Sequence, residues 1–168
     1  SYANIDGFVG DEDLVNDDKL EELDRWLLSR LNSTTRKVEG CFETYDCTNA
    51  ARAIERFVDE FSNWYIRRSR ERFWAGKKTS DKGRLKADEK LAAYQITSLS
   101  LQTIAIMMSP IAPFFSDWLY RKTKNWSDGR AVRSVHLAEF PVSDEKYLDL
   151  DLETRMGLAR QIVQMVLL

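Results

Sequence analysis

The sequence predicts an all-α protein. Its 168 residues include only seven glycines and three prolines, so the turn residues that hairpins need are scarce. Apolar residues recur at spacings of three, four or seven, which is the period of an amphipathic helix. The hydrophobic fraction of 43% and the charged fraction of 31% are those of an ordinary folded protein with one core. We therefore predict a helical bundle of four to five helices.

The first two helices follow from apolar periodicity. The first is predicted over residues 17–43, with Asn16 or Asp17 as its N-terminal cap. The second is predicted over residues 48–75, with Gly76 as its C-terminal stop. Its apolar positions form one stripe, which consists of Ile54, Phe57, Val58, Phe61 and Tyr65.

The third helix, residues 87–109, is predicted to be the most buried. Its apolar residues surround nearly the whole circumference, and Pro110 ends it because proline disfavours helix at the preceding residue. A polar, basic connector at residues 77–86 precedes this helix and is predicted to be a mobile loop. A fourth helix is predicted over residues 113–124, since proline suits a first helical turn; its core candidates are Phe114, Phe115 and Trp118.

The remaining residues predict little regular structure until the end of the chain. The stretch SVHL at residues 134–137 is a candidate extended segment. A last helix is predicted from about Leu152, because apolar residues recur on one face. The sequence stops at Leu168 without a capping signal, and we interpret this as a helix that continues in a longer protein.

The sequence offers no catalytic residue and no metal or cofactor site. His136 is the single histidine, and no nucleophile with an orienting group stands near it in a recognisable spacing, so we expect it to be structural. Cys41 and Cys47 match no common zinc pattern and are expected to be reduced thiols. No phosphate-binding glycine motif occurs. No run approaches the roughly 18 apolar residues of a membrane span, which predicts a cytoplasmic protein without membrane contact.

Charge is distributed unevenly along the chain. The formal net charge is -2, yet residues 1–24 contain nine acidic residues and one lysine. Residues 61–90 instead contain ten lysines and arginines and four acidic residues. A basic region in an acidic protein indicates either an anionic partner or internal charge pairing.

Helical phase divides the motif NWYIRRSRERFW, residues 63–74, between two faces. At about 100° per residue, Tyr65, Arg68 and Arg72 are predicted to face inward and to hold the bundle together. The opposite face is predicted to contact nucleic acid through phosphate binding and base stacking. Alternatively, it is a solvated face, broken by Asp59 and Glu60, or it contacts another domain. The predicted contacts on this face are Arg52, Arg56, Asn63, Arg67, Arg70 and Trp74, with Lys77, Lys78 and Arg84 as an electrostatic guide in the following connector.

Several segments resemble one family throughout the chain. The order of these segments is similar to that in the anticodon-binding helical domain of class I isoleucyl-tRNA synthetases. Valyl and leucyl synthetases share that fold, but WYIRRSRERFW at 64–74 and SVHLAEFP at 134–141 favour the isoleucyl type. The resembling segments are SYANIDGF at 1–8 and DRWLLSRL at 24–31, NWYIRRSRERFW at 63–74, MSPIAPFFSDWLY at 108–120, SVHLAEFP at 134–141 and ARQIVQMVL at 159–167.

The resemblance implies a module that binds isoleucine tRNA and does not itself perform the ligation. Such enzymes activate isoleucine with ATP and magnesium through HIGH and KMSKS motifs, and this sequence has neither. The implied partners are isoleucine tRNA and the catalytic and C-terminal domains of a monomeric parent enzyme. The implied division is a lead-in at 1–16, an anticodon-binding bundle at 17–143 and the start of a C-terminal helix at 144–168. The alternatives are a structural coupling domain with little RNA contact, or a stand-alone helical interaction module.

Overall fold

The computed structural model describes Phe8 and residues 20–74, 81–123 and 133–166, with the side chains of residues 81–87 outside this description. Six α-helices and no strand occur in these ranges, which confirms the all-α prediction. The elements are α2 (Glu22–Glu43), α3 (Cys47–Asp59), the π-helix η2 (Glu60–Ile66), α4 (Arg70–Trp74), α5 (Asp81–Met108), α6 (Pro113–Thr123), the 3-10 helices η3 (Val135–Leu137) and η4 (Glu145–Tyr147), and α7 (Leu150–Val166).

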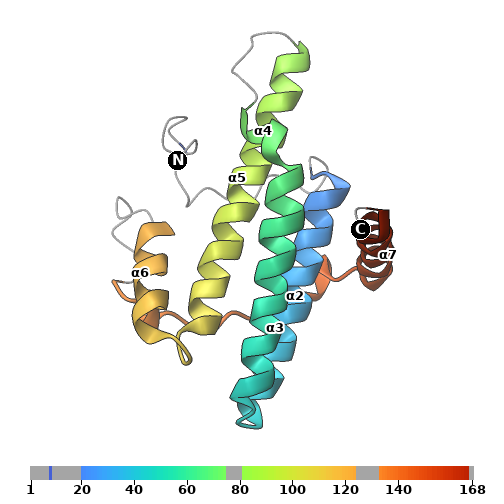
Figure 1. Ribbon diagram of the computed structural model, residues 1–168. Helices are drawn as coiled ribbons and strands as arrows, with labels where there is room; N and C mark the ends of the chain where they lie inside the picture. Colours follow the sequence, from blue (N-terminus) through green and yellow to red (C-terminus); the bar gives the residue numbers. More distant parts are fainter. Residues whose placement is uncertain (1–7, 9–19, 75–80, 124–132, 167–168) are drawn as a thin grey trace.

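The long helices form the centre of the bundle. Helices α2, α3 and α5 run side by side, while α6 packs against α5 on one side and α7 packs against α2 on the other (Figure 1). In this view α7 is seen nearly end-on, so it crosses the long helices at a steep angle. The largest side chains of the shared core are Trp26, Tyr65, Phe57, Leu27, Leu28, Ile96 and Met107.

Helices α3 and α4 are joined through η2 into one long helical segment. Asp46 caps its start by accepting a 3.0 Å hydrogen bond from the backbone N–H of Asn49, and α3 begins at Cys47, one residue before the predicted start at 48. Backbone angles remain right-handed helical on both sides of η2, at Asp59 and at Arg67. The predicted second helix therefore exists, but one stretch of it has the wider π geometry.

Several predicted boundaries differ from the structure. Helix α2 begins at Glu22 after a capping box of Glu21 and Asp24, and continues through Gly40 to Glu43. The predicted caps Asn16 and Asp17 and the stop Gly76 lie outside the described residues. Helix α5 begins at Asp81, so the second half of the predicted 77–86 loop is helical.

Two further expectations, on the SVHL segment and on His136, differ from the structure. The SVHL segment forms the 3-10 turn η3 instead of an extended piece, because the Ser134 hydroxyl accepts from the backbone N–H of His136 and starts the turn. The His136 side chain is exposed, so it is not a packed structural histidine.

The aromatic residues of α6 are not core residues. Phe114, Phe115 and Trp118 are 91%, 51% and 55% exposed. Helix α6 lies at the edge of the bundle, and the face it turns inward carries Ser116 and Tyr120, which are buried one turn apart. Aromatic residues at helical spacing therefore marked the outer face here.

The apolar helix α5 satisfies the length and composition of a membrane span, contrary to the sequence expectation. Within the 21 residues from Asp88 to Met108, the most apolar 18-residue stretch has a mean hydropathy of 1.3. Of that stretch, 56% is buried inside the protein. Helix α5 contacts α2, α3, α4 and α6. Its place at the centre of the bundle accounts for an apolar surface on nearly every side.

Candidate nucleic-acid interface

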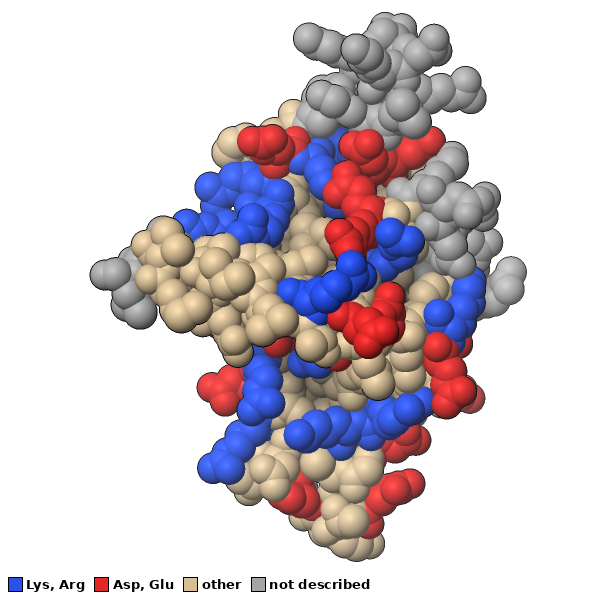
Figure 2. All heavy atoms as spheres, turned by 90° about the vertical axis from the view of Figure 1, so that its right-hand side faces the viewer, with Lys and Arg blue, Asp and Glu red and all other residues tan. Residues whose placement is uncertain are grey.

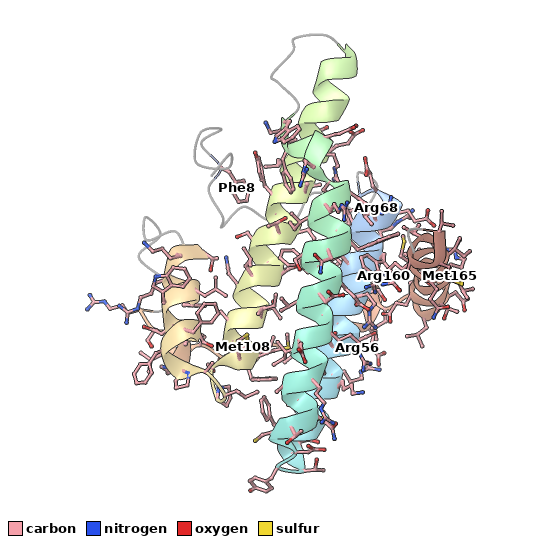
Figure 3. The ribbon with its side chains drawn as sticks, viewed as in Figure 1. Phe8, Arg56, Arg68, Met108, Arg160 and Met165 are labelled. Atoms are coloured by element: carbon pink, nitrogen blue, oxygen red, sulfur yellow. The ribbon has the colours of Figure 1, made fainter. Side chains whose placement is uncertain are left out.

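The predicted outward residues are all exposed along one helical segment. Arg56 and Arg68 lie on the side of this segment that looks toward α7, and Arg160 reaches from α7 into the space between them (Figure 3). Asn63 is held in place by a 2.6 Å hydrogen bond from its Nδ2 to Oδ1 of Asp59. The exposed predicted contacts are Arg52, Arg56, Asn63, Arg67, Arg70 and Trp74.

The face beside α7 carries many arginines and lysines, but acidic residues stand between them. Figure 2 shows blue and red side chains interleaved over this side of the molecule, with wide tan areas between them. A continuous positive surface suited to a duplex backbone is absent from the described part of this face. The charge pattern suits separate contacts to individual phosphates and bases.

Tyr65 and Arg72 face inward, as the helical phase predicts. The Tyr65 hydroxyl donates to Oδ1 of the fully buried Asp24 at 2.7 Å. Arg72 donates to both oxygens of the same carboxylate, and its Nη2 also donates to the carbonyl of Glu89 at 2.7 Å. Burial raises the pKa of Tyr65 well above its ordinary value, and the neighbouring Asp24 carboxylate raises it further.

Arg68 differs from its prediction, because its side chain is exposed. Its guanidinium Cζ lies 3.7 Å from the centroid of the Trp64 ring, so it stacks on the indole at the surface. The next residue, Ser69, occupies the buried position instead. Arg68 therefore belongs with the outward residues.

The π-helix explains this displacement. In an α-helix, residues four apart differ in direction by about 40°, so a stripe at that spacing drifts around the helix. Here the rings of Phe57 and Phe61 are parallel to within 9°, and those of Phe61 and Tyr65 to within 13°. The wider turn of η2 offsets this drift, so that residues four positions apart stay on one face of the helix. The inward position after Tyr65 consequently falls on Ser69 and moves Arg68 outward.

The same segment directs Glu60 into a buried network of charges. Its side chain accepts 2.8 Å hydrogen bonds from Arg30 of α2 and from Arg160 of α7. Arg30 also donates to Glu153 of α7 at 2.8 Å. The alternative interpretation of this face placed Glu60 among solvated charges, whereas Glu60 is 7% exposed and joins three helices.

Two pKa shifts accompany this network. Burial by itself lowers the pKa of Arg30, but hydrogen bonds to Glu153 and Glu60 outweigh it and raise the pKa overall. Burial raises the pKa of Glu153, but hydrogen bonds from Ser29, Ser33 and Arg30 outweigh it and lower the pKa overall. Both shifts favour the charged forms that the ion pair requires.

Sequence patterns held a partial signal for these buried charges. Asp24 precedes Leu27 by three positions and Leu31 by seven, so it stands in the apolar stripe of α2. A carboxylate in such a stripe requires a buried partner. Glu60 had no such signal, because a π-helix cannot be recognised from apolar spacing at 3.6 residues per turn.

The remaining predicted contacts cannot be placed in this interface. Lys77 and Lys78 lie outside the described residues. The backbone of Arg84 belongs to α5, but its side chain lies outside the description. Their role as an electrostatic guide stays a prediction.

A groove lies between this helical segment and α7. Its volume is about 660 Å³, and its walls come from α3, η2 and α4 on one side and from α7 on the other. It brings together the predicted contacts Asn63 and Arg67, whereas Arg52, Arg56, Arg70 and Trp74 lie outside its lining. Asn63 and Arg67 therefore share one groove with residues of α7.

Comparison with known proteins identifies the fold that carries this interface. The sequence matches the family described as the anticodon-binding domain of tRNA ligase over residues 24–167, and the chain belongs to that family. It is 46% identical over 99% of its length to an isoleucine–tRNA ligase of Porphyromonas gingivalis. It is 43% identical over 99% to that of Bacteroides thetaiotaomicron and 39% identical over 98% to that of Dehalococcoides mccartyi. The chain spans about 14% of the length of the first two relatives and 15% of the third.

Proposed function

We propose that this chain is the anticodon-binding part of an isoleucine–tRNA ligase and positions isoleucine tRNA for aminoacylation by a catalytic domain of the same longer protein. The observation that carries the proposal is the exposed basic side of α3, η2 and α4, in a member of the tRNA ligase anticodon-binding family. Arginines placed at intervals along a rigid helix suit the regularly spaced phosphates of an RNA strand.

The chemistry of ligation belongs to the catalytic domain. Neither HIGH nor KMSKS occurs in this sequence, and no group of three His, Cys, Asp or Glu that could hold a metal exists among the residues the structure describes. ATP and magnesium are accordingly proposed to bind in that catalytic domain. The task of this chain is to bind the tRNA and to fix its orientation.

A salt titration tests the phosphate contacts. In the variant Arg67→Ala/Arg70→Ala, the affinity for isoleucine tRNA should fall and the slope of log K against log salt should decrease by about one per lost contact. Arg121→Ala is the matched control, because Arg121 is exposed on α6, on the side of the bundle opposite α7 (Figure 1). Equal slopes in the double variant and the unmodified chain would refute the assignment to this face.

A second candidate role is docking onto other domains, and exposed apolar residues favour it. Phe114 and Trp118 are exposed on α6, and Leu158 and Ile162 on α7. Surface aromatic and aliphatic residues of this kind are typical of protein interfaces. If this role dominates, the 168-residue chain will bind tRNA no better than an acidic control protein, while the apolar faces will bind the catalytic or C-terminal part.

The isoleucine specificity, the monomeric state and the cytoplasmic location belong to the same proposal. Competition with valine and leucine tRNAs measures the specificity, and the isoleucine tRNA should compete best. Light scattering of the purified chain measures its mass, which should be the 19.6 kDa of one copy. Burial of α5 inside the bundle supports a location in aqueous surroundings.

A further inference from the structure

The groove between α7 and the long helical segment has the size of a small-ligand site. Its volume of about 660 Å³ lies within the range of roughly 300–1,000 Å³ that such sites occupy. Its wall on the α3–η2–α4 side contributes Asn63, Trp64, Arg67 and Arg68, and α7 contributes Arg160 and Gln164. Hydrogen-bonding amides therefore face the groove from both sides.

A planar cation forms one part of this wall. The Arg68 guanidinium covers the Trp64 indole at 3.7 Å, and the Arg68 side chain is exposed. One face of the guanidinium lies on the indole, so the other is open to a ligand. Unpaired nucleobases stack on arginine planes of this kind, whereas an ammonium group offers no such plane. The Trp64 Nε1 atom itself is buried and meets no acceptor among the described residues, so the indole offers the groove its ring and not this donor.

The charge balance of the groove favours a single base over a dense row of phosphates. Asp59 and Glu71 also line it and place carboxylates among the arginines. Arg160 pairs with Asp59 at 3.4 Å and with Glu60 at 2.8 Å, so part of its charge is already compensated. Carboxylates repel phosphates but accept hydrogen bonds from the amino groups of bases.

We propose that this groove holds one unpaired nucleobase of the bound tRNA. The base stacks on the open face of Arg68, Asn63 and Gln164 meet its edge, and Arg67 contacts its phosphate. This inference rests on the proposed function and adds the class of ligand group and the residues that receive it. It also gives Arg68 a role in RNA recognition that differs from the phosphate contacts of Arg52 and Arg56.

Abasic substitution of the RNA tests the inference. The 168-residue chain is titrated with an anticodon stem–loop, and the base at each loop position is removed in turn. Removal of the stacked base should weaken binding by about tenfold, as expected for the loss of one stack. In Arg68→Ala the same removal should cost less than about twofold, because the partner of the base is already gone. In the control Arg52→Ala the abasic loss should stay near tenfold.

A charge-preserving variant separates stacking from electrostatics. Arg68→Lys should respond to abasic RNA as Arg68→Ala does, while its salt slope stays near that of the unmodified chain. Full retention of the abasic effect in Arg68→Lys would overturn the stacking role. Asn63→Ala is the second variant, and its discrimination among the four bases at the sensitive position should fall. Circular dichroism confirms that each variant is folded.

The remaining outcomes are also decisive. If the intact stem–loop binds but no abasic position is linked to Arg68, this inference fails and the proposed function stands. If the intact stem–loop does not bind, both fail. Tighter binding of free nucleoside monophosphates than of the stem–loop would make the groove a nucleotide site and overturn the assignment to tRNA. Displacement of bound stem–loop by peptides, with no effect of abasic positions, would likewise overturn it.

Discussion

Arg72 donates hydrogen bonds to both carboxylate oxygens of Asp24, from Nη1 to Oδ1 at 2.8 Å and from Nη2 to Oδ2 at 2.7 Å. Asp24 lies in the first turn of α2 and is fully buried, while Arg72 belongs to α4. Tyr65 adds a third donor to the same carboxylate. Such a fork is the strongest geometry for an arginine and a carboxylate, and here it joins three helices, since Arg72 also reaches α5.

Removal of the carboxylate should destabilise the bundle severely. In Asp24→Ala the guanidinium of Arg72 and the hydroxyl of Tyr65 lose their buried acceptor, and the expected loss of unfolding free energy is about 3–5 kcal/mol. Urea denaturation followed by circular dichroism measures it. Tyr65→Phe keeps the ion pair and should lose only about 1.5–3 kcal/mol, as for one hydrogen bond to a charged group. A loss below 1 kcal/mol in Asp24→Ala, which is roughly the value of a surface pair, would contradict the role of this cluster.

The charge of Glu153 should make the docking of α7 dependent on pH. Its pKa is lowered in the folded protein, so the stabilisation is complete above the ordinary pKa of a glutamate and disappears as the pH falls through the lower, folded value. Glu153→Gln should therefore be less stable than the unmodified chain at pH 7, and this difference should shrink below about pH 4.

Urea titrations at both pH values measure that difference. The matched control is Glu145→Gln, because the Glu145 side chain is 85% exposed and its pair with Arg36 is open to solvent. The control should change stability little at either pH. An equal deficit of Glu153→Gln at neutral and acid pH would show that its charge contributes nothing.

Phe61 and Arg70 should differ strongly in their contributions to stability. Phe61 is buried and stacks between Phe57 and Tyr65, whereas Arg70 is exposed. Phe61→Ala loses apolar burial and leaves a cavity, so it should be less stable than Arg70→Ala by about 3 kcal/mol. Thermal melts of both variants provide the comparison. Equal melting shifts would mean that the face assigned to the core is wrong.

Arg160 should control how firmly the second half of α7 is held. Its Nη1 donates to Glu60, and few other contacts hold the part of α7 that follows, where Ile162 and Met165 are exposed. In Arg160→Ala, amide exchange in α7 should accelerate by about tenfold, which corresponds to the loss of roughly 1.4 kcal/mol of local stability. Exchange in α2 should remain unchanged.

Arg155→Ala is the matched control for this measurement. Arg155 lies on the same helix, but its 3.6 Å pair with Glu22 is exposed on both sides. The control should leave the exchange of α7 within about twofold of the unmodified chain. The same acceleration in both variants would show that the Glu60 contact has no special part in holding α7.

Local sequence rules predicted the helices well where one physical signal dominated. Apolar periodicity located the long helices, and Pro113 marked the start of α6 to the residue. Burial on one face also assigned Tyr65 and Arg72 to the interior. These features depend on interactions within one helix, which the sequence order expresses directly.

The failures arose where the deciding interaction was distant in sequence. The exposure of Phe114 and Trp118 depends on α6 lying at the edge of the bundle, which no local spacing reveals. The burial of Glu60 depends on arginines 30 positions earlier and 100 positions later. The groove itself exists only because α7 crosses the long helical segment, so its lining could not be assembled from either element alone.

The π-helix has a consequence for how related chains evolve. Each π turn accommodates one residue more than an α-helix would place over the same rise, so the segment Glu60–Ile66 behaves as a tolerated single-residue insertion. Deleting Ser62, which is exposed, would allow the ordinary helical winding to return. Every later side chain would then keep its direction relative to those before it, because the π turn had absorbed the extra residue, and Arg72 would still point toward Asp24. A relative that lacks this residue can therefore keep the buried ion pair while its helix winds without a π turn.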